Sequence, residues 1–127
     1  MFSHVMVGSN DLDRAKTFYD ALFSAMGGKP GRVDPKGRLS YLHKGAAFMV
    51  SKPIDGQPAC HANGGTIGFA MDGLDQVEAW HKAGMANGGI AIEDPPGPRQ
   101  GSFGPLYLAY LRDPDGNKLC ALYRMPS

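Results

Sequence analysis

The two halves of this chain repeat one pattern of residues. A strand-like segment, a polar turn and an amphipathic helix occur near the N-terminus and occur again after about residue 65. One common spacing relates four pairs of positions, which are His4 and Thr66, Leu12 and Leu74, Asp13 and Asp75, and Phe18 and Trp80. The period is longer than that of solenoid repeats, so it predicts two copies of one βαβββ unit rather than a stack of short repeats.

Each half contains one predicted helix. In the first half, apolar residues recur at three- and four-residue steps from Leu12 to Met26, after the capping residue Asp11 and before Gly27. The second half shows the same pattern from Leu74 to Met85. The aromatic residues on these stripes are predicted to lie in the core, and they are Phe18, Tyr19 and Trp80.

The remaining segments are predicted to be strands and turns. Residues 38–43 and 46–50 are typical of a hairpin, whereas residues 51–64 contain two prolines and two glycines without apolar periodicity. The sequence therefore predicts a single domain over residues 1–127. Its first module covers about 1–52, its linker about 53–64 and its second module about 65–124.

The segment Asp113-Pro114-Asp115-Gly116 has the composition of a type I turn followed by a glycine in the left-handed conformation. With that bulge, Tyr110 lies opposite Cys120 in a C-terminal hairpin. A plain turn would shift the register and place Tyr107 there instead. The preceding strand, residues 106–111, is apolar at every position, so both of its faces are expected to be covered.

Charge and cysteine content exclude several classes of function. The formal net charge is +1, so no basic face for nucleic acid is expected. No apolar run approaches the roughly 18 residues of a membrane span, and the N-terminus lacks a signal-peptide pattern. Cys60 and Cys120 are far apart without a CxxC spacing, which favours reduced thiols and a cytoplasmic location.

Three segments together carry a resemblance to a known family. They are His4-Val5 before Asp11-Leu12-Asp13-Arg14-Ala15 and Phe18-Tyr19, then Ile67-Gly68-Phe69-Ala70, and finally Asp113-Pro114-Asp115-Gly116-Asn117-Lys118. Over nearly its whole length the chain resembles the vicinal oxygen chelate superfamily, which contains glyoxalase I, the bleomycin-resistance proteins and the extradiol dioxygenases. The resemblance implies an α+β fold of two tandem βαβββ modules that form an open, incomplete barrel with a central cavity. Homodimers are common in such families.

The resemblance also implies a divalent metal, held by a His or Gln that opens each module and a Glu near the last strand of each. Only His4 matches this pattern. The other three positions correspond to Phe48, Thr66 and Cys120, so no metal cofactor is expected. The alternative is a different set in which His43 or His61 joins His4 and Cys120 on a metal such as Zn or Ni.

The candidate site residues have alternative structural roles. His4 is a candidate general base, or else a histidine bonded to the backbone at a strand end. A ligand pocket is predicted from Phe48, Met49, Thr66, Tyr107, Tyr110 and Cys120, although the same side chains could be ordinary core. Arg99 lies in a proline- and glycine-rich loop over residues 94–105, where it could clamp a substrate carboxylate or remain solvated.

The sequence thus predicts a glyoxalase/bleomycin-resistance-like protein that binds a small organic molecule without a metal. The alternative is a metal-dependent lyase or isomerase of the lactoylglutathione-lyase type, in which His4 abstracts a proton. An extradiol dioxygenase is less favoured, because its iron site requires a carboxylate. A third hypothesis is a structural or regulatory dimer whose cavity is filled by bulky side chains such as Phe48.

Overall fold

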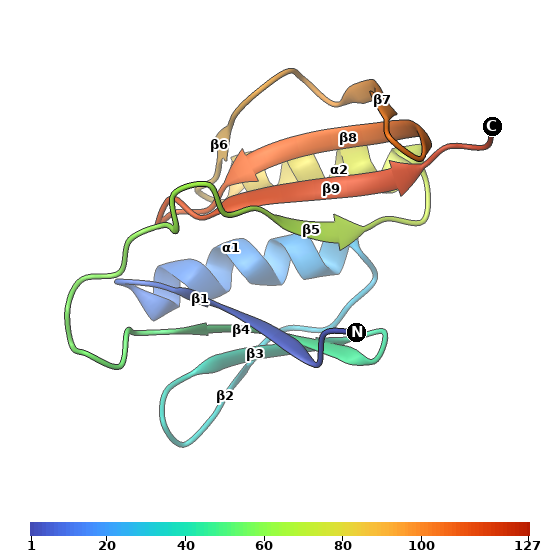
Figure 1. Ribbon diagram of the computed structural model, residues 1–127. Coiled ribbons are helices and arrows are strands. Elements are labelled where there is room, and N and C mark those ends of the chain that lie inside the picture. Colours follow the sequence, from blue (N-terminus) through green and yellow to red (C-terminus); the bar gives the residue numbers. More distant parts are fainter.

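The computed structural model describes all 127 residues as two sheets and two helices (Figure 1). Sheet A has the strand order β1-β4-β3-β2, and sheet B has the order β5-β9-β8-β6, with β7 also paired to β8. Neither sheet closes into a barrel. The elements are β1 (His4–Gly8), α1 (Leu12–Ala25), β2 (Arg32–Val33), β3 (Leu39–His43), β4 (Ala46–Ser51), β5 (Ile67–Ala70), α2 (Leu74–Ala86), β6 (Ile90–Ala91), β7 (Gly97–Gly101), β8 (Gly104–Arg112) and β9 (Lys118–Arg124).

Each half of the chain forms its own sheet. The first strand of each half pairs in parallel with the last strand of the same half, β1 with β4 and β5 with β9, and the remaining pairs are antiparallel. Residues between β4 and β5 form no helix or strand. This arrangement is the α+β fold of two βαβββ units that the sequence predicts, with a connecting segment between them.

The edge strand of the second half differs from the prediction of a loop over residues 94–105. It is present as two pieces, because β6 and β7 both pair with β8. Between them lie Pro95 and Pro96, which have no backbone N–H to donate to a ladder, and Glu93 with a positive φ of 58°. Seven residues of the predicted loop, 97–101 in β7 and 104–105 at the start of β8, therefore belong to sheet B.

Both helices form where the apolar stripes predict them. The side chain of Asp11 caps α1 by accepting a hydrogen bond from the backbone N–H of Arg14 at 3.0 Å, and Gly27 follows the helix with φ 80°. The N-cap of α2 is Gly73, which offers no side-chain bond. Neither helix combines the length and apolar character needed to cross a membrane.

The helices pack closely against each other at Gly84 of α2. A Cβ added there would lie 2.3 Å from Leu111 Cδ1 and 3.1 Å from Leu22 Cδ2. A side chain at this position must therefore displace the core of both halves.

Replacing Gly84 with leucine is expected to lower the free energy of unfolding by about 2 kcal/mol or more, because the added carbons overpack this contact. Urea denaturation followed by circular dichroism measures the change. Ala86→Leu, at an exposed position of the same helix, is the matched control and should leave stability nearly unchanged. Equal stability of the two variants would contradict the close helix contact.

One hydrophobic core joins the two sheets. Helix α1 lies between them (Figure 1), and the ring of Phe48 from β4 lies 5.4 Å from that of Phe69 from β5. Phe23 of α1 contacts both rings, with centroid distances of 6.0 Å to Phe48 and 5.8 Å to Phe69. The sheet sides that pack on the helices thus share this core, and each sheet turns its other side away from it.

We call these outward sides the open faces. Because side chains alternate along a strand, the strand register assigns each residue to one side. The open face of sheet A carries His4, Met6, Gly8, Ser40, Leu42, Ala47, Met49 and Ser51. The open face of sheet B carries Gly68, Ala70, Leu106, Leu108, Tyr110, Arg112, Lys118, Cys120, Leu122 and Arg124.

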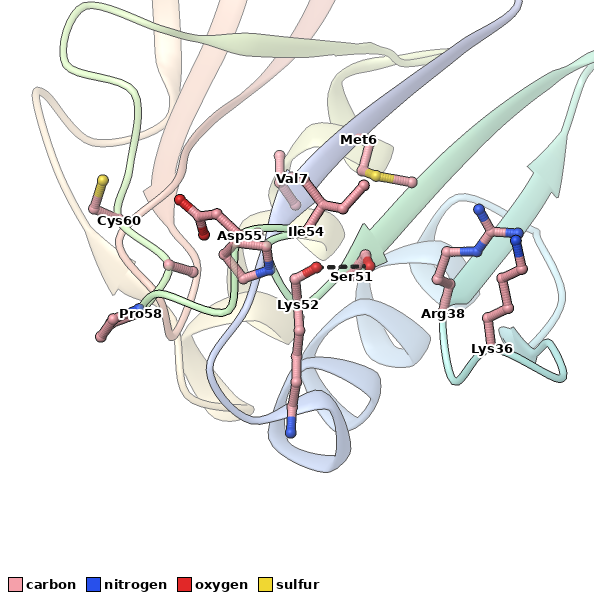
Figure 2. Close-up of a pocket in the computed structure, with 13 residues that line it drawn as sticks. Met6, Val7, Lys36, Arg38, Ser51, Lys52, Ile54, Asp55, Pro58 and Cys60 are labelled. Atoms are coloured by element: carbon pink, nitrogen blue, oxygen red, sulfur yellow. Dashed lines mark hydrogen bonds between the residues drawn. The ribbon is translucent and has the colours of Figure 1, made fainter.

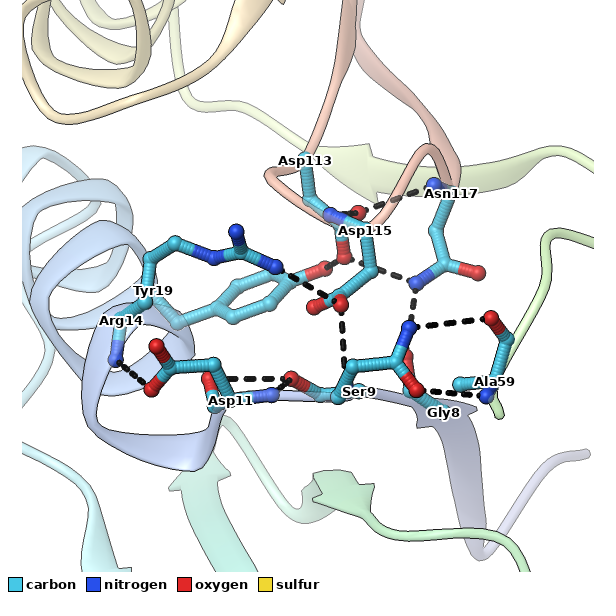
Figure 3. A network of polar contacts seen from close by, with 10 residues as sticks. Gly8, Ser9, Asp11, Arg14, Tyr19, Ala59, Asp113, Asp115 and Asn117 are labelled. Carbon is cyan, nitrogen blue, oxygen red and sulfur yellow. Dashed lines mark hydrogen bonds and ion pairs between the residues drawn. The ribbon is translucent and has the colours of Figure 1, made fainter. Parts of the chain in front are cut away.

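A buried polar network connects α1 to the turn between β8 and β9 (Figure 3). Tyr19 donates from its hydroxyl to Asp113 Oδ2 at 2.5 Å, and Asn117 Nδ2 donates to the same oxygen at 2.8 Å. Asn117 Nδ2 also donates to the Gly8 carbonyl at 3.1 Å. Burial, together with the Asp113 carboxylate, raises the pKa of Tyr19 well above its ordinary value, so the phenol stays protonated as the donor.

The same turn binds the N-terminus of α1 through Asp115. Its Oδ1 accepts from the backbone N–H of Asn10 at 2.9 Å and from Arg14 Nη2 at 3.0 Å. The turn itself has the predicted form, since the Gly116 N–H donates to the Asp113 carbonyl and Gly116 has φ 93°. The network therefore ties the start of the first half to the end of the second.

Candidate functional site

The open face of sheet A is apolar and uncovered. Met6 is 45% exposed and Leu42 is 73% exposed, whereas Val7, Phe48 and Val50 on the other side of the same sheet are buried. Single exposed apolar side chains are common. Here Met49 and Ala47 of β4 connect Met6 to Leu42 across the sheet, and a connected apolar series on one sheet face is typical of a surface that binds something.

A cavity of about 830 Å³ lies where this face meets the connecting segment (Figure 2). Met6 and Gly8 of β1 and Ser51 of β4 form its floor, and the chain after β4 borders it through residues 52–55 and 58–60. Figure 2 shows Met6, Val7 and Ile54 together in the middle of the cavity. We call this space the open-face cavity.

The open-face cavity has cationic and acidic ends. Lys36 and Arg38, from the hairpin between β2 and β3, lie together on one side, and Asp55 lies on the other side with the exposed Cys60 (Figure 2). Arg38 Nε donates to Asp34 Oδ2 at 2.7 Å, which orients the guanidinium. Hydrogen bonds from the Arg38 backbone and side chain help to hold the pKa of Asp34 below its usual value.

His4 lies on the open face of sheet A but does not line this cavity. It is exposed, and its Nδ1 is 2.8 Å from the Ser3 hydroxyl. Strand alternation corrects the position chosen from the sequence for the first module's carboxylate. Met49, and not Phe48, shares the open face with His4, while Phe48 packs 4.8 Å from the ring of Tyr19 in the core.

Cys120 and Tyr110 lie directly opposite each other on the open face of sheet B, as the bulged turn predicts. Cys120 is buried, and that burial raises the pKa of its thiol, so it is not an activated thiolate. Burial likewise raises the pKa of Tyr110, whose ring lies 4.9 Å from Lys118 Nζ. The structure thus brings Tyr110 and Cys120 together as predicted, but both side chains stay protonated and neither is activated as a nucleophile.

The other predicted residues are more scattered. Tyr107 lies on the opposite side of sheet B, where its hydroxyl donates to Glu78 Oε1 of α2 at 2.7 Å. Thr66 precedes β5, is exposed and lines two small cavities of about 260 and 240 Å³ beside the connecting segment.

Arg99 has no free guanidinium for a substrate. Its Nη1 donates to the Gly97 carbonyl at 3.0 Å, and its Nη2 donates to the carbonyls of Asp94 and Pro95 at 3.1 Å each. These bonds hold the break between β6 and β7 in place. The Arg99 side chain thus stabilises the backbone of the edge strand.

The donor atoms present do not fit the family's metal. The four corresponding positions now read His4, Met49, Thr66 and Cys120, an imidazole, a thioether, a hydroxyl and a buried thiol, with no carboxylate among them. Divalent metals that bind substrate oxygens favour imidazole and carboxylate ligands. No three His, Cys, Asp or Glu side chains of the structure form a group that could hold a metal ion, which also disfavours the alternative set with His43 or His61.

Sequence reasoning missed the cationic side of the open-face cavity. Lys36 and Arg38 stand in a short polar turn, where charged residues are ordinary. The alternation of strand β3 beyond Leu39 would have placed Arg38 on the open face, but the contribution of the connecting segment depends on its path.

Comparison with known proteins agrees with this fold. A family model described as Glyoxalase/Bleomycin resistance protein/Dioxygenase superfamily matches residues 1–121. A search of curated proteins gave no match. Among solved structures, a glyoxalase/bleomycin resistance protein from Albidiferax ferrireducens T118 is 56% identical with a TM-score of 0.94, and the match covers 98% of this chain and 99% of that one.

More distant structures share the fold alone. A glyoxalase/bleomycin resistance protein/dioxygenase family enzyme from Burkholderia phytofirmans PsJN is 16% identical with a TM-score of 0.71, and the match covers 97% of this chain and 98% of that one. A lactoylglutathione lyase from Agrobacterium tumefaciens is 22% identical with a TM-score of 0.66, covering 97% and 92% respectively. The repeated modules, the two open sheets and the family-model match together show that this chain belongs to the glyoxalase/bleomycin resistance protein/dioxygenase superfamily.

Proposed function

We propose that this protein binds a small organic acid in the open-face cavity and does so without a divalent metal. The observation that carries the proposal is the combination of the apolar side chains Met6, Val7 and Ile54 in the cavity with the paired cations Lys36 and Arg38 on one side. Apolar walls with a few convergent polar groups are typical of ligand sites, and a guanidinium fits a carboxylate in two-point contact. The cavity volume lies in the range of such sites.

We further propose that a second copy of the chain covers the open faces. Met6 and Leu42 expose apolar surface on sheet A, and a partner copy would remove that surface from water. Homodimers are the common form in families of this kind. In such a dimer, the predicted ligand-binding residues Thr66, Tyr110 and Cys120 would face a space enclosed by the second copy. Their roles in ligand binding stay predictions.

A lyase or isomerase of the lactoylglutathione-lyase type is the second candidate. The observation in its favour is the exposed imidazole of His4 on the open face, where it could accept a proton from a carbon next to a carbonyl. Against it, the donor set does not fit the metal that would polarise that carbonyl. We therefore propose binding, rather than turnover, as the principal function.

Removing the two cations should selectively weaken the binding of acids. A panel of small organic acids and their neutral amides is titrated against the protein by ligand-observed NMR. The double variant Lys36→Gln with Arg38→Gln is expected to weaken acid binding by about tenfold, equivalent to about 1.4 kcal/mol, and to leave the amides unchanged. Lys29→Gln with Arg32→Gln removes the same charge outside the cavity and is the matched control.

Metal analysis completes this test. Inductively coupled plasma mass spectrometry on protein purified without chelator, and again after incubation with Zn, Ni, Mn or Fe(II), should find far less than one metal per chain. A stoichiometric metal would overturn the metal-free proposal. Equal loss of acid and amide affinity in the double variant would instead remove the role of the two cations.

A further inference from the structure

A second pocket lies away from the open-face cavity, where the first strands of the two halves approach each other. Its volume is about 430 Å³, and it shares no lining residue with the open-face cavity. Twelve of its fifteen lining residues are hydrophobic. Met1 and Phe2 precede β1, Met26 follows α1, and the other hydrophobic residues come from α1, β1, β3, β4 and β5. Both halves of the chain therefore contribute to this space, which we call the inter-module pocket.

Aromatic rings form the inner wall of the inter-module pocket. Phe23, Phe48 and Phe69 are buried, with interplanar angles of 89° for Phe23 and Phe69, 64° for Phe48 and Phe69, and 38° for Phe23 and Phe48. Phe23 also stacks on Tyr41 at 4.4 Å, so the rings are packed on one another and together form an aromatic wall for a ligand ring to lie against.

Small residues leave the pocket unfilled. Ala46, Ala47, Gly68 and Ala70 line it, and a Cβ added at Gly68 would meet no atom within 4 Å. Ala46, Gly68 and Ala70 are exposed, so the pocket is a groove open to solvent and not an interior cavity. An apolar guest would gain contacts here that the chain's own side chains do not make.

The mouth of the pocket provides a positive charge. Lys44 and His43 line it, and Lys44 Nζ lies 2.7 Å from Asp72 Oδ1. The side chains of that pair are 58% and 66% exposed, and an ion pair so exposed contributes little free energy. A ligand carboxylate can therefore replace Asp72 beside Lys44 at small cost.

We propose that the inter-module pocket binds a small aromatic monocarboxylate. Its ring lies against the wall that Phe23, Phe48 and Phe69 form, and its carboxylate pairs with Lys44 at the mouth. Because the walls come from both halves, the bound ligand stabilises their contact and raises the melting temperature. This site shares no lining residue with the open-face cavity, so ligand binding at either place can fail without the other.

The test uses 2-naphthoate as the probe and 2-naphthylmethanol as its neutral analogue. Isothermal titration calorimetry gives the affinities, and amide chemical shifts locate the bound probe. We expect shifts at residues 43–48 and 67–70. Ala46→Phe, which fills the pocket from β4, should weaken naphthoate at least tenfold, whereas Ala86→Phe, on the exposed end of α2, should not.

A second pair of variants tests the positive charge of Lys44 at the mouth of the pocket. Lys44→Gln should weaken naphthoate by roughly threefold to tenfold and leave 2-naphthylmethanol unchanged, and Lys29→Gln should alter neither. Three outcomes overturn the proposal. They are equal naphthoate affinity of Ala46→Phe and wild type, shifts confined to residues 36–38 and 51–60, and binding that requires dissociation of a dimer, since a second copy would then be the natural cover.

Discussion

Replacing Asp113 with alanine is expected to lower the free energy of unfolding by about 3–5 kcal/mol. The carboxylate accepts four hydrogen bonds, two at Oδ1 from the backbone N–H groups of Asp115 and Asn117, and two at Oδ2 from Tyr19 and the Asn117 amide. Alanine leaves these donors without a partner in a buried region, at roughly 1–3 kcal/mol for each that stays unsatisfied. Water entering the space recovers part of that cost.

Urea denaturation followed by circular dichroism measures this effect, and two further variants separate its parts. Tyr19→Phe removes one donor and keeps the other three bonds, so its expected cost is about 1–2 kcal/mol. Asp55→Ala removes an exposed carboxylate and should change stability by less than about 0.5 kcal/mol. A loss below about 1 kcal/mol for Asp113→Ala would mean that the network does not hold the two halves together.

Two adjacent residues of β4 should respond very differently to truncation. Phe48→Ala is expected to cost about 3–5 kcal/mol, because its ring contacts Tyr19, Phe23 and Phe69 in the core. Met49→Ala is expected to cost about 1 kcal/mol or less, because Met49 is only partly buried on the open face.

The free energies of unfolding of both variants are measured by denaturation in the same series. Because both substitutions place alanine in the same strand, the change in strand propensity is similar for the two. The ratio of the two losses tests the register of the strand directly, since a shift by one residue would exchange the two side chains between faces. Similar losses for both variants, or a larger loss for Met49→Ala, would contradict the assignment of faces and with it the donor set at the family's metal position.

The repeat and the C-terminal hairpin could be predicted from sequence because they depend on local chemistry. Helix periodicity, the Asp11 cap and the left-handed Gly116 act within a few residues, and they determined both helices and the Tyr110–Cys120 register. The face of Phe48 could not be predicted in this way. Residues 46–50 are apolar at every position, and a strand without alternation does not indicate which side is buried.

The candidate site was harder to predict than the fold. Arg99 was predicted to bind a substrate carboxylate, but its guanidinium donates to backbone carbonyl groups of nearby residues instead. The positions of these carbonyl groups depend on the path of the backbone around two prolines. The open-face cavity depends in the same way on the course of residues 52–60. The path of an irregular segment in space cannot be predicted from sequence periodicity. The sequence therefore did not indicate that Lys36 and Ile54 line the same cavity.

In each half of the chain, the parallel pairing of the first strand with the last determines when the sheet can form during synthesis. Strand β1 pairs only with β4, and β5 pairs only with β9, so neither first strand has a ladder partner until the end of its own half has left the ribosome. The first half can close once residue 51 has emerged, whereas the bond from Asn117 to the Gly8 carbonyl bridges 109 positions and must form late. In a nascent chain stalled between these points, β5 has emerged but its only pairing strand, β9, has not.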